Sequence, residues 1–289
     1  MVSSPRPRIA IATCASYPEL KGDDEGLAEA LRTRGCEAEL VVWDEDGIDW
    51  TVFDLCLVRS AWDYHEKYDE FLAWTRRVAE ATALHNPADL IAWNSEKTYL
   101  RELARAGVPT VPTLWVERGS DIDIPGEIAA RGWANLVVKP VVDLGAKNLH
   151  KVEAGEAHHA LTSVLTRQDA MVQPFLPSLE TEGELSLIYI DGTFSHAVRK
   201  RPAAGDFRVQ SIWGGTAEST TPEPRQLDIA KRALAHLGEP PLYARVDPVA
   251  GLDGNPCLIE FELIEPNLYL SSDPAATDAL ASAVLQHLS

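Results

Sequence analysis

The chain has few cysteines and no long hydrophobic run, and each absence excludes a class of protein. Among its 289 residues, no apolar stretch approaches the roughly 20 residues that a membrane-spanning helix needs. The apolar run at 9–14 is too short for a signal peptide and predicts a first strand. The four cysteines, Cys14, Cys36, Cys56 and Cys257, form no CxxC pair. That spacing is typical of reduced, mostly buried thiols, and we expect a cytoplasmic protein.

Basic residues are also scarce. The chain holds 26 lysines and arginines against 44 aspartates and glutamates, which gives a formal net charge of −18. Such an acidic balance disfavours binding to nucleic acid or to an anionic membrane. An anionic ligand must therefore be bound by a local basic cluster, and one occurs at Arg199, Lys200, Arg201 and Arg208. Because a charge cluster is more often a solvated face than a site, this one needs support from its context.

The N-terminal third alternates strand and helix patterns. Apolar runs predict strands at 8–14, 39–43 and 53–58, and helical spacing predicts helices at 24–35 and 68–82. This β-α-β-β-α order predicts a small doubly wound parallel sheet. Ligands of such sheets bind at the carboxyl ends of the strands, so loops at that edge are candidate binding segments.

The remainder of the chain predicts an α+β organisation with antiparallel hairpins. Asp191-Gly192 is a hairpin turn signal between two apolar runs. The expected strands lie at 113–116, 136–139, 171–175, 185–190, 194–200, 243–249 and 258–263. The expected helices lie at 96–106, 126–131, 155–166, 226–237 and 276–288.

Two glutamates inside the last apolar run indicate the chemistry. In a strand, Glu260 and Glu262 point to the same face. Two carboxylates packed together away from water repel each other unless a proton or a cation neutralises them. Oxygen ligands on a strand suit Mg²⁺, which usually takes substrate phosphates as further ligands. The alternative is an exposed edge strand with two solvated glutamates.

Three further residues fit a phosphate site. Lys139 ends an apolar strand pattern, where its ammonium emerges at one edge, and a loop with a single glycine follows at 143–148. Lys97 stands at a predicted helix start, with Ser95 as the N-cap. Asp247 ends the strand pattern that precedes the two glutamates, so it would supply a third carboxylate. Taken singly, the loop would be a turn and Lys97 a solvated helix residue.

The order of these elements resembles the ATP-grasp superfamily over nearly the whole chain. The matching series runs Lys97, Lys139, 171–176, Glu184, Arg208, Asp247, Glu260 and Glu262. The resemblance implies an ATP-grasp fold with an N-terminal doubly wound parallel-sheet α/β substrate domain and two α+β ATP-clamping domains. Its boundaries would fall at 1–93, 94–172 and 173–289.

The resemblance also implies ligand sets for ATP and Mg²⁺, with Mn²⁺ as a substitute. Lys97 and Lys139 would contact the α- and β-phosphates. The adenine hinge would comprise Gln173, Pro174, Phe175 and Leu176. Glu184 would bind the ribose hydroxyls, with Glu180 as the competing candidate. The metal would be held by Asp247, Glu260 and Glu262, with Asn267 as a further candidate.

The chain departs from the superfamily pattern in two places. The loop at 143–148 is poorer in glycine than is usual for the phosphate loop. The second metal carboxylate is commonly followed or replaced by asparagine, whereas this chain has Glu262; Asn267 could take that part.

A closer resemblance is to the ATP-grasp branch that contains D-cycloserine synthetase. Its motifs lie at 59–64, 183–187, 195–202, 205–210 and 262–266. This resemblance implies that a carboxylate is activated as an acyl phosphate and attacked by a nitrogen of the same molecule. Such chemistry needs positioning and charge stabilisation rather than a nucleophilic side chain, and no Ser-His-Asp or Cys-His pattern occurs.

The substrate residues are expected from loops and from the basic cluster. Arg208, Lys139 and Arg199 are the candidate catalytic residues, and Arg208 would bind the transferred phosphate. Substrate contacts are expected from Arg59, Asp63, Tyr64, Lys200, Arg208 and Gly215. The segment at 59–65 could equally be a structural corner, and the segment at 213–215 could be a lid or only a turn.

Three functions fit the sequence. The first is the cyclising ligase, with conversion of O-ureido-D-serine to D-cycloserine in antibiotic biosynthesis as the specific expectation. The second is an intermolecular carboxylate–amine ligase of the glutathione-synthetase or peptide-tailoring kind. The third, a non-catalytic ATP-binding regulator, predicts erosion of the metal carboxylates. We expect a small-molecule carboxylate as partner, no nucleic acid and no membrane; analogy with related enzymes makes a homodimer one option.

Overall fold

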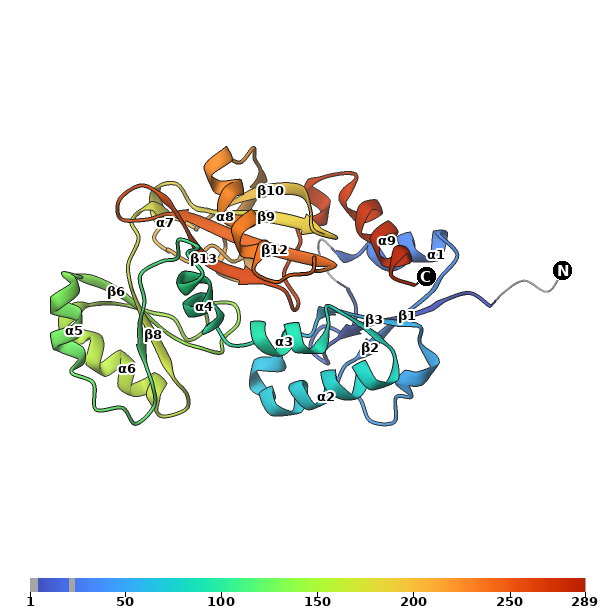
Figure 1. Ribbon diagram of the computed structural model, residues 1–289, viewed down its shortest axis with the longest axis horizontal. Coiled ribbons are helices and arrows are strands. Elements are labelled where there is room, and N and C mark those ends of the chain that lie inside the picture. Colours follow the sequence, from blue (N-terminus) through green and yellow to red (C-terminus); the bar gives the residue numbers. More distant parts are fainter. Residues whose placement is uncertain (1–4, 21–23, 289) are drawn as a thin grey trace.

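The computed structural model describes residues 5–20 and 24–288, which form three β-sheets flanked by helices (Figure 1). The ATP-grasp arrangement of one parallel and two antiparallel sheets confirms the expected fold class. The outermost residues of the first and last expected domains, 1–4 and 289, lie outside the described part. The domain boundaries themselves stay a prediction.

The first sheet is parallel and has the order β2-β1-β3-β4. Its strands are β1 (Arg8–Thr13), β2 (Glu37–Val42), β3 (Leu55–Ser60) and β4 (Ala83–His85). Three of these strands match the apolar runs of the sequence. The fourth, β4, was not predicted, because three residues carry too little pattern to indicate a strand.

Alternation along β1 and β3 buries both faces of this sheet. Ile9 and Leu55 pack against α1 (Leu27–Thr33) and α9 (Ala276–Gln286), which lie side by side in Figure 1. Their neighbours Ala10, Ala12, Cys56 and Val58 point to the opposite face and pack against α2 (Tyr68–Ala81). Helices on both faces are what the doubly wound prediction required.

The second sheet is antiparallel, with the order β5-β8-β6-β7. Its strands are β5 (Leu114–Val116), β6 (Asn135–Pro140), β7 (His150–Glu153) and β8 (Ala170–Pro174). Leu136, Val138 and Val172 pack under α5 (Ile124–Arg131) and α6 (Ala157–Leu165). The alternate residues, Lys139 among them, therefore face away from these helices.

The third sheet is also antiparallel, with the order β11-β10-β9-β12-β13. Its strands are β9 (Glu184–Ile190), β10 (Thr193–Arg201), β11 (Thr216–Ser219), β12 (Tyr243–Ala250) and β13 (Pro256–Glu262). The expected hairpin at Asp191-Gly192 joins β9 to β10, and both of its residues have positive φ. Apolar residues of one face pack on α4 (Tyr99–Arg105) and α8 (Pro224–Ala235). The other face of this sheet carries the polar residues.

Short elements account for most of what the sequence pattern missed. Besides β4, these are β7, β11, α3 (Ala88–Asn94) and α7 (Ser178–Thr181). None of them exceeds seven residues, so periodicity has little length in which to show.

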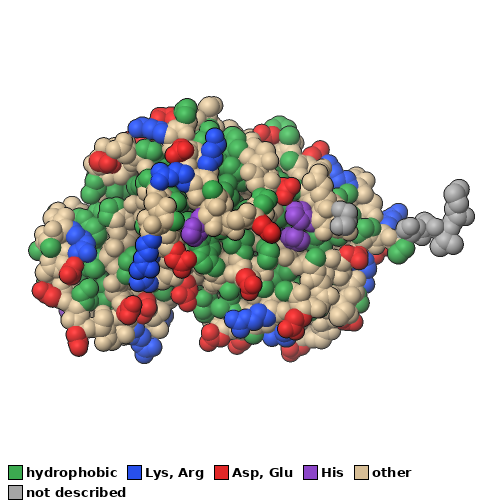
Figure 2. Space-filling view, viewed as in Figure 1, with side chains coloured by type: hydrophobic (Ala, Val, Ile, Leu, Met, Phe, Trp, Pro, Cys, Tyr) green, Lys and Arg blue, Asp and Glu red, His purple; other side chains and the backbone are tan. Residues whose placement is uncertain are grey.

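The surface and the thiols agree with the composition. All four cysteines are buried and free. Within the described residues, no helix combines the length and hydrophobicity needed to cross a bilayer. Figure 2 shows charged side chains of both signs interspersed over the face in view, and no continuous basic surface is visible among the described residues there.

One half-buried histidine makes the stability of this fold depend on pH. His85 on β4 lies 4.6 Å from the ring of His287, which in turn contacts Asp191 at 3.2 Å. Burial and then the neighbouring His287 lower the pKa of His85 from 6.5 to about 4. Between pH 6.5 and about 4, His85 is therefore protonated in the unfolded chain and neutral in the folded chain. The free energy of unfolding falls as the pH drops through this range.

We predict that His85→Gln removes this part of the pH dependence. Urea unfolding between pH 4.5 and pH 7.5 should give a flatter stability profile for the variant than for the wild type. His158→Gln, on the exposed surface of α6, should keep the wild-type slope. Equal slopes for His85→Gln and the wild type would contradict the assignment.

Candidate active site

The polar face of the third sheet borders a cavity of about 310 Å³. The first sheet contributes Trp62 and Tyr64 from the loop after β3, and the second contributes Lys139. A smaller cavity of about 60 Å³ adjoins it, with Lys139, Glu184 and Gln210 in the walls of both. All three sheets thus meet around one continuous site.

Three carboxylates from adjacent strands converge at this site. One oxygen from each of Asp247, Glu260 and Glu262 lies within 4.8 Å of the others. The register explains the convergence, because Asp247 on β12 stands opposite Glu260 on β13. β13 is an edge strand, as in the alternative interpretation, but its glutamates line the cavity and their side chains are only 22% and 29% exposed.

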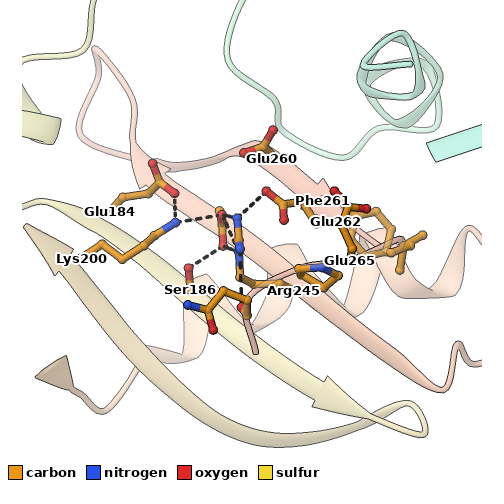
Figure 3. Close-up of polar contacts among 12 residues, drawn as sticks. Glu184, Ser186, Lys200, Arg245, Glu260, Phe261, Glu262 and Glu265 are labelled. Atoms are coloured by element: carbon orange, nitrogen blue, oxygen red, sulfur yellow. Dashed lines mark hydrogen bonds and ion pairs between the residues drawn. The ribbon is translucent and has the colours of Figure 1, made fainter. Parts of the chain in front are cut away.

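Two cations hold Asp247, which is fully buried. Lys200 Nζ lies 3.1 Å from one carboxylate oxygen and also contacts Glu184 (Figure 3). Arg245 lies 2.9 Å from the same carboxylate and bridges it to Glu262. A buried carboxylate needs such partners, because an unpaired charge in the interior is strongly destabilising.

Two further lysines face the carboxylates across the cavity. Lys97 Nζ lies 3.1 Å from Glu260 and donates a hydrogen bond of 2.9 Å to the backbone oxygen of Asp143. Lys139 has no recorded hydrogen bond or ion pair within the described residues, although it lines both cavities. Burial lowers the pKa of Lys139 more than the neighbouring carboxylates, Glu260 first among them, raise it.

The two strand glutamates differ in their affinity for a proton. Burial opposes the ionisation of Glu260, but Lys97 and Lys139 outweigh it and hold its pKa below the ordinary value. Burial raises the pKa of Glu262 well above its ordinary value, only partly offset by Arg245. Glu184 shows the same effect of burial, with a pKa of about 7. The site therefore holds more negative charge than its own cations neutralise.

These residues fit a divalent cation. Five cationic side chains, Lys97, Lys139, Lys147, Lys200 and Arg245, lie at the larger cavity together with six carboxylates, Asp143, Glu184, Asp247, Glu260, Glu262 and Glu265. A cation bound among the three converging carboxylates would offset the repulsion between them, which is strong because the carboxylates are buried. Carboxylate oxygens are the ligands that Mg²⁺ prefers.

Most of the expected site residues meet here. The larger cavity is lined by Lys97, Lys139, Tyr64, Glu184, Lys200, Glu260, Glu262 and Asn267. The smaller cavity is lined by Gln173, Pro174, Leu176 and Arg208, and the Phe175 ring stacks edge-on against Phe207. The side-chain oxygen of Asn267 accepts a hydrogen bond from the backbone N–H of Tyr269 at 3.0 Å.

Seven of the expected residues do not line either cavity. Asp247 is fully buried within the carboxylate cluster, and the Phe175 ring packs against Phe207; the other five are held elsewhere. Arg59 is fully buried between Asp24 and the backbone oxygen of Pro266. Asp63 accepts a hydrogen bond of 2.8 Å from the Trp43 indole.

The other three are held by surface or backbone contacts. Glu180 pairs with Lys151 at 2.7 Å. Arg199 bonds to the backbone oxygen of Glu182 at 3.4 Å, on an exposed site. Gly215 packs against backbone, where an added Cβ would lie 2.0 Å from the Val209 oxygen.

The glycine-poor loop at 143–148 still makes a tight turn. Gly145 and Ala146 both adopt positive φ, so an alanine takes a conformation that usually selects glycine. Trp213 donates a hydrogen bond of 3.0 Å to the Gly145 oxygen, and Arg208 lies over the Trp213 ring at 3.5 Å. The segment at 213–215 thus contacts this loop, as a lid would.

Sequence reasoning missed three residues of the site. Arg245 and Ser186 stand two residues from Asp247 and Glu184 respectively, so strand periodicity places each pair on one face. Ser186 donates a hydrogen bond of 2.7 Å to Asp247. The third is Glu265, which follows β13 and lines the cavity. The available signal was a third carboxylate in the same apolar segment, after Glu260 and Glu262.

Comparisons with known proteins agree with this geometry. The family model described as D-cycloserine synthetase DcsG, N-terminal domain, matches residues 9–86. The prokaryotic glutathione synthetase ATP-grasp domain matches residues 126–264. The cycloserine biosynthesis protein DcsG of Streptomyces lavendulae is 33% identical over 97% of this chain and 98% of its own length.

Solved structures show the same similarity. The crystal structure of D-cycloserine synthetase DcsG superposes with a TM-score of 0.88 at 32% identity, covering 98% of this chain and 100% of that one. D-alanine–D-alanine ligase from Bacillus anthracis, complexed with ATP, superposes with a TM-score of 0.70 at 16% identity, covering 98% and 97%. The second likeness concerns the fold alone.

We predict that Glu260→Gln combined with Glu262→Gln abolishes most of the Mg²⁺-dependent gain in ADP affinity. Loss of two charged ligands should weaken binding in Mg²⁺ about 10- to 100-fold, whereas binding without Mg²⁺ changes little because the lysines remain. Calorimetric titrations with and without Mg²⁺ measure both. Glu127→Gln, on α5 beside Arg131, is the matched control. An undiminished Mg²⁺ effect in the double variant would show that the cation binds elsewhere.

Proposed function

The chain belongs to the DcsG family of ATP-grasp carboxylate–amine ligases, and on that premise we propose that it cyclises O-ureido-D-serine to D-cycloserine. The ATP-grasp family uses ATP and Mg²⁺. One observation carries the proposal: Asp247, Glu260 and Glu262 converge opposite Lys97 and Lys139. That arrangement suits a nucleotide triphosphate held between ammonium groups and a metal ion.

Different residues of the chain would bind the metal ion, the phosphates and the ribose of the nucleotide. Asp247, Glu260 and Glu262 would hold Mg²⁺, which supplies charge neutralisation at the phosphates when bound. Lys139 would bind phosphate oxygens directly, because its ammonium lacks a partner within the described residues. Lys97 would exchange part of its contact with Glu260 for a phosphate. Glu184 suits the ribose better than Glu180, because only Glu184 lines the cavities.

The smaller cavity would take the adenine ring. Its lining includes the apolar side chains of Val111, Leu176, Leu179 and Ile259. Among the described residues, no acceptor is recorded for the backbone N–H of buried Leu176, which leaves it for a base nitrogen. Pro174 lacks an N–H, but the hinge requires only a carbonyl there.

The reaction would proceed in two substitutions. The substrate carboxylate oxygen bonds to the γ-phosphorus while the bond to ADP breaks, which gives an acyl phosphate. The aminooxy-derived nitrogen then attacks the acyl carbon, the C–O bond to phosphate breaks, and the ring closes with loss of a proton. The carbamoyl group leaves with one water as carbon dioxide and ammonia. Arg208 would stabilise the transferred phosphate, and both substitutions need preorganised charge rather than a protein nucleophile.

The second candidate is an intermolecular carboxylate–amine ligase. The match of residues 126–264 to a glutathione synthetase domain favours it, because that segment includes most of the nucleotide and metal residues. The match of residues 9–86 to the DcsG N-terminal domain favours cyclisation, because that segment contributes Trp62 and Tyr64 to the cavity. A non-catalytic regulator ranks last, since the three metal carboxylates are retained and converge.

We predict ADP release from ATP, Mg²⁺ and O-ureido-D-serine alone, with D-cycloserine as the product. A coupled ADP assay and mass spectrometry measure these together, across a panel of acids with and without an added amino acid. Release only when a second amine is present would refute cyclisation and support the intermolecular ligase.

Lys139→Met should lower kcat/KM by about 100-fold or more, because charge neutralisation at the phosphates is a main contribution to catalysis.

A further inference from the structure

Glu265 occupies a part of the cavity that the nucleotide and metal do not explain. It follows β13 directly and is 6% exposed, yet it lines the larger cavity. The neighbouring wall consists of aromatic side chains, Tyr17, Trp62 and Tyr64, supplied by the first sheet's loops. Tyr17 and Trp62 pack edge-to-face with ring centroids 5.0 Å apart.

The backbone around Glu265 is fixed from both sides. The indole N–H of Trp62 donates to the Glu265 backbone oxygen at 3.2 Å. Arg59 donates to the next backbone oxygen, that of Pro266, at 2.7 Å, and Arg59 is itself held by an ion pair with Asp24. These bonds hold the segment in place without using the Glu265 carboxylate.

The Glu265 carboxylate has no counter-ion of its own. Within the described residues, no ion pair and no hydrogen bond to another side chain is recorded for it, and the nearby cations are engaged elsewhere. Lys97 contacts Glu260, and Arg245 contacts Asp247 and Glu262. A buried carboxylate that contacts only the backbone N–H of its own residue is costly unless a ligand supplies a positive charge.

The aromatic wall favours the same kind of ligand. The faces of tryptophan and tyrosine rings attract cations, and the attraction grows when water is excluded. A carboxylate in a cavity that Trp62 and Tyr64 also line therefore suits an ammonium group. The opposite side of the cavity, with Lys97 and Lys139, suits anionic groups.

We propose that Glu265, together with Trp62 and Tyr64, binds the ammonium group of the substrate. Resting on the proposed function, this inference narrows the substrate to a zwitterionic amino acid whose carboxylate is activated while its ammonium is held. An ammonium bound to Glu265 carries no free electron pair. The nucleophile is therefore a different nitrogen, either elsewhere in the same molecule or on a second substrate.

The test compares ligands that differ only at this group. Binding of D- and L-amino acids, O-ureido-D-serine among them, is measured by calorimetry with a non-hydrolysable ATP analogue and Mg²⁺. Each amino acid is paired with the 2-hydroxy acid that bears the same side chain. We expect the preferred amino acid to bind about 10- to 100-fold more tightly than its hydroxy counterpart, the usual range for a hydrogen bond to a charged group. Equal binding of the pair, or binding by no amino acid, overturns the inference.

Variants then assign the preference to Glu265. In Glu265→Gln the ratio between the two ligands should fall toward one, whereas Glu265→Asp should keep part of it. A structural role would weaken both ligands equally and leave the ratio unchanged, which would also overturn the inference. Trp62→Phe should retain more of the preference than Trp62→Leu, although both lose the indole hydrogen bond. If Glu265→Gln does not fold, the wild-type ratio and the Trp62 pair still decide.

The proposed function fails in a different way. ADP release is followed in parallel for every acid in the panel. Release without discrimination between amino and hydroxy acids would leave the ligase proposal intact and refute only the ammonium subsite. Preferential binding of amino acids without ADP release would do the opposite.

Discussion

The fully buried carboxylate of Asp247 is the constraint around which the site is organised. Lys200, Arg245 and Ser186 all bond to it. Because each of these comes from a strand of the same sheet, the register of β9, β10 and β12 is tied to the solvation of a single charge. Removing one partner would leave a buried charge uncompensated, a cost of about 3–5 kcal/mol in comparable cases. The ion pairs and hydrogen bonds on the polar face therefore stabilise the sheet, whether or not a ligand is bound there.

The same network gives Glu260 and Glu262 different ion-pair partners and different pKa values. Arg245 bridges Asp247 and Glu262, whereas Glu260 faces the lysines of the opposite wall. Burial raises the pKa of Glu262, whereas Lys97 and Lys139 hold the pKa of Glu260 low despite its burial, so the carboxylate cluster favours an added positive charge. A metal ion and a cationic substrate group can supply this charge at two places, near Glu262 and near Glu265. Both proposed subsites, for the nucleotide and for the substrate, thus follow from the excess of carboxylates over cationic side chains around this cavity.

Strand periodicity explains both what the sequence could predict and what it could not. The i, i+2 rule placed Glu260 and Glu262 on one face, and the sheet confirms it with Asp247 opposite Glu260. The same rule, applied to Asp247, would have found Arg245. Elements such as β4 and β7 carried too few residues for a pattern. Which strands become neighbours depends on long-range packing, and no local signal in β9 indicates that it lies beside β12.

Arg59 shows how packing can place a residue away from the cavity that its residue type suggests. An arginine near the carboxyl end of a strand in an α/β domain is a natural anion ligand, and no local sequence pattern indicates that Asp24 lies against it. In the fold, Arg59 is buried by Asp24 and the Tyr243 ring, and its remaining bond goes to the backbone of Pro266. That bond joins the first sheet to the segment that carries Glu265. An arginine expected to touch the substrate instead holds in place the carboxylate that we propose does so.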